Sequence, residues 1–184
     1  PLGVRVGEAA RFDGFVVGSN AEILGLLTAA VPPRALWLWG RRGTGKSHLL
    51  QAACAAAGAQ GRTATCLDLE SGGAPGLLDG CEALDLVCLD GLERVSQDAA
   101  WNAAIFRLHT LMQDGSGRLY VTSTAPPASL RFRLPDLRSR LLAAPVHQLQ
   151  PLDEQGQVEA LQRRATRRGL ELSQEAATWL VHRM

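Results

Sequence analysis

Short apolar runs recur along the chain and alternate with segments whose apolar residues fall at helical spacing. The runs are rich in aliphatic and aromatic residues and are bounded by Gly, Pro or acidic positions, which is typical of β-strands. The five predicted strands cover residues 35–39, 63–69, 84–90, 119–123 and 146–149. Because these runs are nearly all apolar, we expect both faces of each strand to be covered, as in a parallel sheet between helices.

Two segments between the predicted strands carry helical patterns. Residues 47–57 are rich in Ala and Leu. Behind a candidate N-cap at Asp98, apolar side chains at helical spacing are Trp101, Ile105, Leu108 and Met112. Strand and helix therefore alternate, and the sequence predicts an α/β domain with a doubly wound parallel sheet.

The pattern changes to helix alone after Pro151. Two apolar helical faces are predicted there, one made by Val158, Leu161 and Ala165 and the other by Ala176, Leu180 and Val181. We therefore predict a linker over residues 1–18, an α/β domain over 19–151, and the start of a small helical lid over 152–184. We expect this lid to be incomplete at Met184.

Composition narrows the class of protein. The chain has 184 residues, 46% of them hydrophobic, and a formal net charge of +1, which suits one sizeable core and gives no wide basic field for strong direct DNA binding. Without a long apolar segment or a signal-like start, we expect a cytoplasmic protein with no membrane partner. The cysteines lack C-x-x-C spacing and are interpreted as reduced core thiols: Cys54, Cys66, Cys81 and Cys88.

The strongest chemical signal is a glycine-rich segment directly after the first predicted strand. Gly40-Arg41-Arg42-Gly43-Thr44-Gly45-Lys46-Ser47 matches the P-loop pattern G-x-x-x-x-G-K-[ST]. The backbone N–H groups of such a loop, together with the following helix dipole, bind phosphates. Lys46, the only lysine of the chain, is predicted to bind the β- and γ-phosphates, and the Ser47 hydroxyl to coordinate Mg²⁺. The alternative is a glycine-rich turn with a structural role only.

Acidic and hydroxyl residues end two later strands. Asp90 is predicted to be the Walker B residue that orients Mg²⁺ through water, the alternative being a strand-ending Asp without this role. Many AAA+ ATPases place a glutamate next, but here Gly91 follows and Glu93 comes two residues later, so we expect weak or no intrinsic ATP hydrolysis. Ser123 and Thr124 are both candidates for a γ-phosphate sensor, with a capped turn as the alternative.

Further motifs are spread over nearly the whole chain. They are Phe12-Asp13-Gly14-Phe15 with Gly18 and Asn20, residues 39–54 and 86–93, Trp101 with Ala104-Ile105-Phe106, Pro126-Pro127, and residues 134–141 and 149–152. Together they resemble the DnaA/Hda branch of the AAA+ family, and its Hda regulators more than its DnaA initiators. The resemblance implies that residues 19–151 form an AAA+ nucleotide-binding domain with ADP or ATP and Mg²⁺ as cofactors.

The resemblance also implies roles for individual residues. It adds Val17, His48 and Ser123 to the P-loop as nucleotide contacts, although neither His48 nor His147 has an acidic partner at catalytic spacing. Arg140 resembles the arginine finger that acts in trans on nucleotide held by a neighbouring subunit. A surface ion pair with Asp136 is the alternative for Arg140. Arg138 is a second candidate for the finger.

The partners implied by the resemblance are DnaA and the DNA polymerase sliding clamp. Pro1-Leu2 is interpreted as the remnant of a clamp-binding peptide. The helix-turn-helix with which DnaA reads origin DNA is absent from this sequence, and the lid-borne sensor arginine of the family is expected beyond Met184. A cluster on the predicted lid is interpreted as a solvated helix face, in preference to a DNA or protein site: Arg163, Arg164, Arg167 and Arg168.

The predicted function is therefore regulation of replication initiation. In this hypothesis the chain binds an adenine nucleotide and, with the sliding clamp, promotes hydrolysis of ATP bound to DnaA. The alternatives are a self-hydrolysing AAA+ ATPase, such as an initiator or helicase loader, and a nucleotide-binding scaffold. A homo-oligomer is compatible with each of them.

Overall fold

The computed structural model describes residues 10–183, so the predicted clamp-binding remnant at Pro1-Leu2 lies outside the described residues. The strands are β1 Ala35–Trp39, β2 Ala64–Asp68, β3 Leu86–Asp90, β4 Arg118–Ser123 and β5 Val146–Gln148. The α-helices are α1 Ala21–Thr28, α2 Lys46–Ala59, α3 Ala99–Asp114, α4 Pro135–Leu142, α5 Glu154–Arg167 and α6 Gln174–Val181. Short 3-10 turns are η1 Phe12–Gly14, η2 Leu69–Ser71, η3 Pro75–Leu78, η4 Cys81–Ala83, η5 Leu92–Arg94 and η6 Pro127–Ser129.

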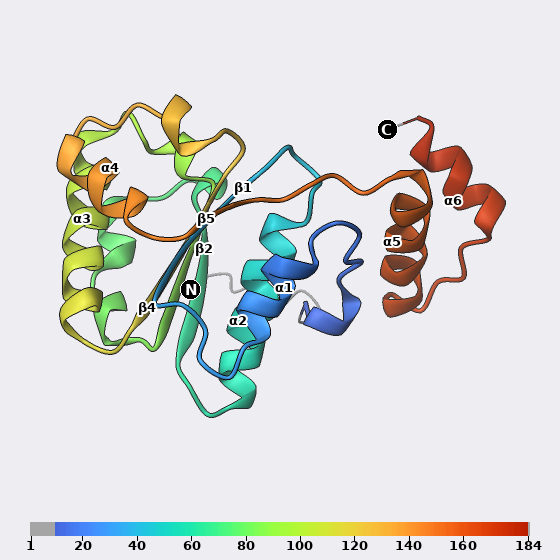
Figure 1. The fold of residues 1–184 in the computed structure, drawn as a ribbon, viewed down its shortest axis with the longest axis horizontal. Coiled ribbons are helices and arrows are strands. Elements are labelled where there is room, and N and C mark those ends of the chain that lie inside the picture. Colours follow the sequence, from blue (N-terminus) through green and yellow to red (C-terminus); the bar gives the residue numbers. More distant parts are fainter. Residues whose placement is uncertain (1–9, 184) are drawn as a thin grey trace.

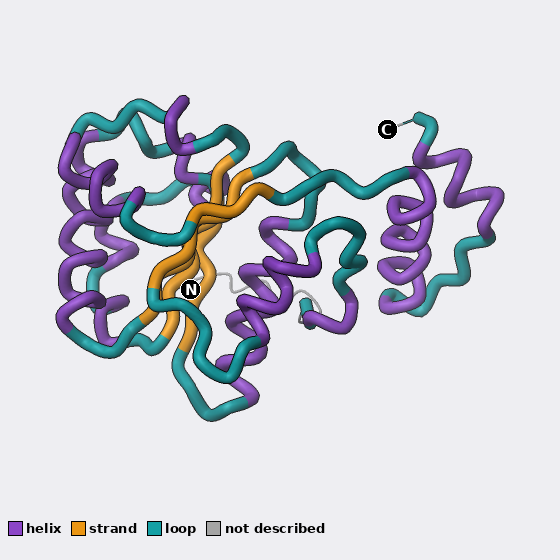
Figure 2. The backbone as a smooth tube through the Cα atoms, in the orientation of Figure 1, coloured by secondary structure: helices purple, strands orange, loops and turns teal. Residues whose placement is uncertain are grey.

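The strands form one parallel sheet between two layers of helices. Its strand order is β2-β3-β4-β1-β5, and every neighbouring pair is parallel. Helices α1 and α2 cover one face, α3 and α4 cover the other, and α5 with α6 forms a separate helical part (Figure 1). Figure 2 shows the twisted strands running between the helical layers. The predicted five-stranded parallel α/β fold is confirmed.

The central strand β1 sends side chains into both hydrophobic layers. Leu36 and Leu38 pack with Leu49 of α2, whereas Trp37 packs with Ile105 of α3 on the opposite face. All five side chains are at most 1% exposed. This alternation follows from the pleat of a strand, in which successive side chains point to opposite faces.

The edge strands are less covered than their apolar sequences predict. Each residue of β2 is half-buried or exposed, and in β5 Val146 is 36% exposed. An edge strand has a neighbour on one side only, so helices that cover the middle of a sheet leave its margins open to solvent. Full coverage is therefore confirmed for the central strands and wrong for β2 and β5.

Helices are present at both predicted segments, and the predicted buried face is confirmed in α3 but wrong in α6. The Asp98 carboxylate accepts hydrogen bonds from the backbone N–H groups of Ala100 and Trp101, which caps α3. In α6 the fully buried residue is Ala177, whereas Ala176 is exposed and Leu180 is 37% exposed. Packing against α5 thus uses a face next to the predicted one. No helix within residues 10–183 is long and apolar enough to cross a membrane.

Candidate functional site

The P-loop sequence forms the turn between β1 and α2. Gly43 and Gly45 have φ angles of +84° and +93°, in the left-handed region that glycine adopts without strain. A Cβ added at Gly45 would lie 2.7 Å from Cε2 of Phe15. The Thr44 hydroxyl donates to the Arg41 carbonyl at 2.9 Å. The glycines thus allow a tight loop that leads directly into the first turn of α2.

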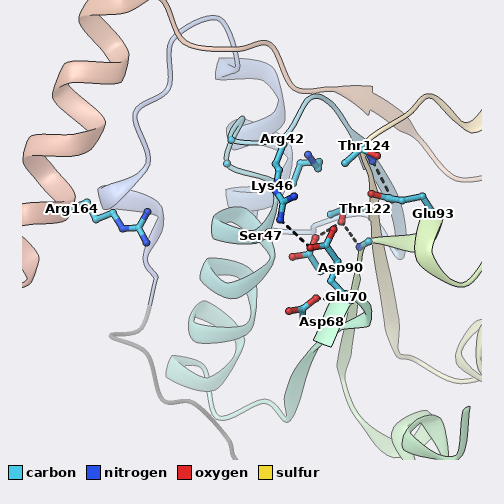
Figure 3. Close-up of a pocket in the computed structure, with 13 residues that line it drawn as sticks. Arg42, Lys46, Ser47, Asp68, Glu70, Asp90, Glu93, Thr122, Thr124 and Arg164 are labelled. Atoms are coloured by element: carbon cyan, nitrogen blue, oxygen red, sulfur yellow. Dashed lines mark hydrogen bonds and ion pairs between the residues drawn. The ribbon is translucent and has the colours of Figure 1, made fainter. Parts of the chain in front are cut away.

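A cavity of about 340 Å³ lies beside this loop at the carboxyl edge of the sheet (Figure 3). Side chains from the loop, from the ends of β2, β3 and β4, and from α5 surround it. Its lining residues are Arg42, Gly43, Gly45, Lys46, Ser47, Asp68, Glu70, Asp90, Gly91, Glu93, Thr122, Thr124 and Arg164. The structure thus brings Lys46, Ser47 and Asp90 together as predicted, while Gly40, Arg41 and Thr44 shape the loop from outside this lining.

Lys46 is the first residue of α2, and it is buried, with only 8% of its surface exposed. Its ammonium donates to the carbonyl oxygens of Gly40 at 2.6 Å and Arg41 at 2.9 Å. Burial lowers the pKa of Lys46, while the nearby carboxylates of Asp90 and Glu93 act in the opposite direction. A bound phosphate would favour the charged ammonium further, since opposite charge stabilises it.

Asp90 is held at the end of β3 by a hydroxyl of the neighbouring strand. The Thr122 Oγ1 donates to Oδ1 of Asp90 and accepts from the backbone N–H of Gly91 at 3.0 Å. Thr122 is completely buried. The Ser47 hydroxyl and the Asp90 carboxylate both line the cavity. These hard oxygen donors fit Mg²⁺, which commonly takes one or two protein ligands together with water and phosphate oxygens.

The other carboxylates of the cavity differ in their partners. Glu70 forms ion pairs with Arg42 at 3.3 Å and with Arg94 at 3.0 Å. Glu93 accepts a hydrogen bond at 3.2 Å from the backbone N–H of Thr124. Within residues 10–183 no group of three His, Cys, Asp or Glu side chains could hold a metal ion without further ligands. A metal in this cavity would therefore depend on phosphate and water oxygens.

Ser123 lies outside the cavity, contrary to its predicted role as a nucleotide contact. Its hydroxyl accepts from the indole N–H of Trp37 at 2.8 Å and donates to the Ala125 carbonyl at 2.7 Å. Thr122 and Thr124 line the cavity instead. Because side chains alternate along β4, Ser123 points to the face opposite to that of Thr122, and Thr124 follows the last residue of the strand. Thr122 is a hydroxyl residue within an apolar run, and this was the sequence signal that could have identified it as a residue of the cavity.

Val17 and His48 do not line the cavity either. His48 Nε2 lies 2.9 Å from the Arg11 carbonyl oxygen, and its ring centroid is 5.9 Å from that of Phe15. Burial lowers the pKa of His48. The Val17 carbonyl accepts from the backbone N–H of Asn20 at 2.8 Å. Both residues connect the N-terminal segment to the body of the domain, so the structure gives no support to their predicted nucleotide contacts.

Arg140 lies on α4, away from the cavity of its own chain. It donates to the Thr110 hydroxyl at 3.3 Å, and its guanidinium carbon lies 4.6 Å from the centroid of the Phe106 ring. Among the described residues it makes no ion pair with Asp136, so that alternative is not seen. Arg138 differs, because its Nε is buried and has no hydrogen-bond partner in the described part of the chain. Arg140 is therefore the exposed arginine of this helix.

The arginines of α5 do not share one solvated face. Arg164 lines the cavity, Arg163 donates to the Asp13 carbonyl at 3.0 Å, and Arg167 lies against Gly14. Arg163, Arg164 and Arg168 are exposed, as the predicted solvated face requires, whereas Arg167 is half-buried against Gly14. The position of Arg164 at the cavity was not predicted, because helical periodicity in a sequence does not show which element a helix faces.

No family model matches the chain. The fold is similar to a crystal structure of a DNA replication initiation factor, at 20% identity over 95% of this chain and 60% of that one, with a TM-score of 0.79. AMPPCP-bound DnaA from Aquifex aeolicus has 20% identity over 98% and 61%, with a TM-score of 0.78. Domain III of DnaA from Thermotoga maritima has 18% identity over 95% and 80%, with a TM-score of 0.79. The chain shares the fold of these structures, and it spans about three fifths of the first two.

Proposed function

We propose that this chain binds ADP or ATP with Mg²⁺ in the P-loop cavity. Lys46, Ser47 and Asp90 provide an ammonium, a hydroxyl and a carboxylate around one space. A DnaA of similar fold has been solved with AMPPCP bound, which supports an adenine nucleotide. Bound Mg²⁺ would neutralise charge on the phosphates. Residues 19–151 are proposed to be the nucleotide-binding domain and residues 152–184 the start of its lid.

We further propose that the chain regulates replication initiation by acting on ATP held by DnaA, together with the sliding clamp. The observation that carries this proposal is the position of Arg140, exposed on α4 and outside its own cavity. Contacts with Phe106 and Thr110 restrict the guanidinium before any partner is present. An arginine held in this way is suited to stabilise negative charge on a phosphoryl group in a neighbouring subunit.

The test is hydrolysis of ATP by ATP-loaded DnaA on clamp-loaded DNA, with this chain added. We expect stimulation by the wild type and its loss, by about 10³-fold, in Arg140→Ala. Arg131→Ala is the matched control, because Arg131 is exposed, does not line the cavity, and its side chain makes no hydrogen bond within residues 10–183. No stimulation by the wild type would refute the regulatory proposal, and loss in Arg138→Ala alone would assign the finger to that residue.

A self-hydrolysing ATPase is the second candidate, and Glu93 is the observation that favours it. The Glu93 carboxylate lines the cavity with Asp90 and is held by the Thr124 N–H. A carboxylate at this place can polarise an attacking water, the role of the glutamate that many ATPases have where this chain has Gly91. Steady-state ATP turnover by the chain alone distinguishes the two functions. Turnover that is lost in Glu93→Gln and unchanged in Arg140→Ala would favour this candidate.

A further inference from the structure

Three cysteines meet where the P-loop helix α2 packs on the strands β2 and β3. The Sγ atoms of Cys54 on α2 and Cys88 on β3 lie 3.6 Å apart. Cys66 of β2 is the direct neighbour of Cys88 in the parallel ladder. We propose that Cys54 and Cys88 form a redox modification site, at which a hydroperoxide joins the two thiols in a disulfide. The bond itself needs no nucleotide, whereas its effect on the cavity rests on the proposed function.

The three thiols are connected by hydrogen bonds. The Cys54 thiol donates to Cys88, and the Cys88 thiol donates to the Leu50 carbonyl oxygen at 3.8 Å. A hydrogen bond from Cys66 lowers the pKa of Cys54, but the bond to Cys88 and burial outweigh it, so this pKa is raised. Burial also raises the pKa of Cys88. The thiols are therefore protonated at neutral pH and stay reduced until an oxidant is present.

Access to solvent gives the two thiols different roles. Cys54 is half-buried, so a small peroxide reaches it first, whereas Cys88 is completely buried. The Cys54 sulfur attacks one oxygen of hydrogen peroxide, the O–O bond breaks, and a sulfenic acid and a water form. The Cys88 sulfur then attacks the Cys54 sulfur, so that an S–S bond forms and a second water leaves. The two thiols are oxidised, and the peroxide is reduced to water.

A disulfide at this place connects two walls of the nucleotide cavity. Helix α2 begins at Lys46 of the P-loop, and β3 ends at Asp90, two residues after Cys88. The two sulfurs must come closer than their present 3.6 Å before they can bond. That movement shifts α2 against β3 and changes the position of Lys46 relative to Asp90. We therefore expect oxidation to weaken binding of Mg-ATP about tenfold, equal to about 1.4 kcal/mol.

The test is incubation of the full, folded chain with excess hydrogen peroxide, followed by mass spectrometry without reductant. We expect a mass lower by two hydrogen atoms, a peptide pair joined through Cys54 and Cys88, and recovery of both thiols in dithiothreitol. Cys54→Ser and Cys88→Ser should each prevent this bond. Cys81→Ser is the matched control and should still form it. Cys81 packs on the other face of the sheet, where its thiol donates to the Leu77 carbonyl at 3.4 Å.

Several results would overturn the proposal. One is a folded chain that keeps its thiols in peroxide while the urea-unfolded chain is oxidised, because the pair would then be protected. Another is a bond from Cys54 to Cys66, or between two chains. Unfolding curves check each variant, and Cys54→Ser decides the matter should Cys88→Ser not fold, since Cys54 is only half-buried.

Calorimetric titration of the reduced and the oxidised chain with Mg-ATP tests the link to the cavity. An affinity that is lower after oxidation and returns in dithiothreitol is the expected result. An unchanged affinity of the fully oxidised chain would overturn the link and leave the disulfide in place. Absence of binding by the reduced, folded chain would overturn the proposed nucleotide site, independently of whether the disulfide forms.

Discussion

Replacement of Thr122 by Val is the most direct test of how the cavity is built. The two side chains have nearly the same shape, so Thr122→Val removes a hydroxyl and leaves little change in volume. In the folded protein that hydroxyl donates to Asp90 and accepts from the Gly91 N–H at 3.0 Å. Thr122 is fully buried, so water cannot readily replace either bond.

The expected loss of stability follows from these two bonds. A buried N–H left without an acceptor costs roughly 1–3 kcal/mol, and the bond to Asp90 adds less because that carboxylate is only half-buried and can be hydrated. We expect the free energy of unfolding to fall by about 2 kcal/mol. With a urea m-value of about 2 kcal/mol/M, the midpoint of urea unfolding should fall by about 1 M.

Urea unfolding followed by circular dichroism in nucleotide-free buffer measures this change. Thr124→Val is the matched control, because Thr124 lines the same cavity but is exposed and its hydroxyl makes no hydrogen bond within residues 10–183. We expect that control to change stability by no more than about 0.5 kcal/mol. A Thr122→Val protein as stable as this control would refute the assignment of the buried hydroxyl bridge.

Three other predictions concern the site and its surroundings. Saturating Mg-ATP, at about 100 times Kd, should stabilise the wild type by about 2.7 kcal/mol but not Lys46→Ala; a retained thermal shift would contradict the P-loop site. Ser123→Ala should cost roughly 1–3 kcal/mol in urea by removing the acceptor of the Trp37 indole N–H, with nucleotide affinity unchanged; the opposite pattern would restore Ser123 as a nucleotide contact. Burial, and then the charge of Arg140, lower the pKa of His109, so the unfolded state binds protons first and stability should fall as pH decreases below 6.5. Urea midpoints at pH 7.5 and 5.5 should differ less in His109→Gln than in the wild type; equal differences would contradict this sign.

The sheet and the P-loop were predictable because both depend on local sequence. Apolar runs of strand length identified β1 and β3, and a glycine pattern directly after β1 identified the loop. Two positive φ angles in that loop require glycine, so the motif and its conformation are inseparable. The coverage of each strand was harder to predict, because burial at β2 and β5 depends on strand order in the sheet.

The side chains at the end of β4 differ in direction, and part of this difference follows from the strand itself. Ser123 and Thr124 were equivalent candidates in the sequence, but only Ser123 belongs to β4, where adjacent residues face opposite sides. Pairing of β4 with β1 places Ser123 beside Trp37 in the core and directs Thr122 and Thr124 to the cavity. Alternation separates Ser123 from Thr122, whereas Thr124 lies beyond the end of the strand. Choosing which of them faces the cavity requires knowing the neighbouring elements.

The neighbours of the arginines of α5 could not be predicted from the sequence alone. Arg163, Arg164 and Arg167 read as one basic cluster, but the structure gives them three different neighbours. Asp13, the partner of Arg163, is 150 residues away in the chain, so no local pattern contains this contact. Once that contact and the Gly14 packing orient the helix, the 3.6-residue period turns Arg164 toward the P-loop. The direction of each of these arginines thus depends on the tertiary packing of α5 against η1.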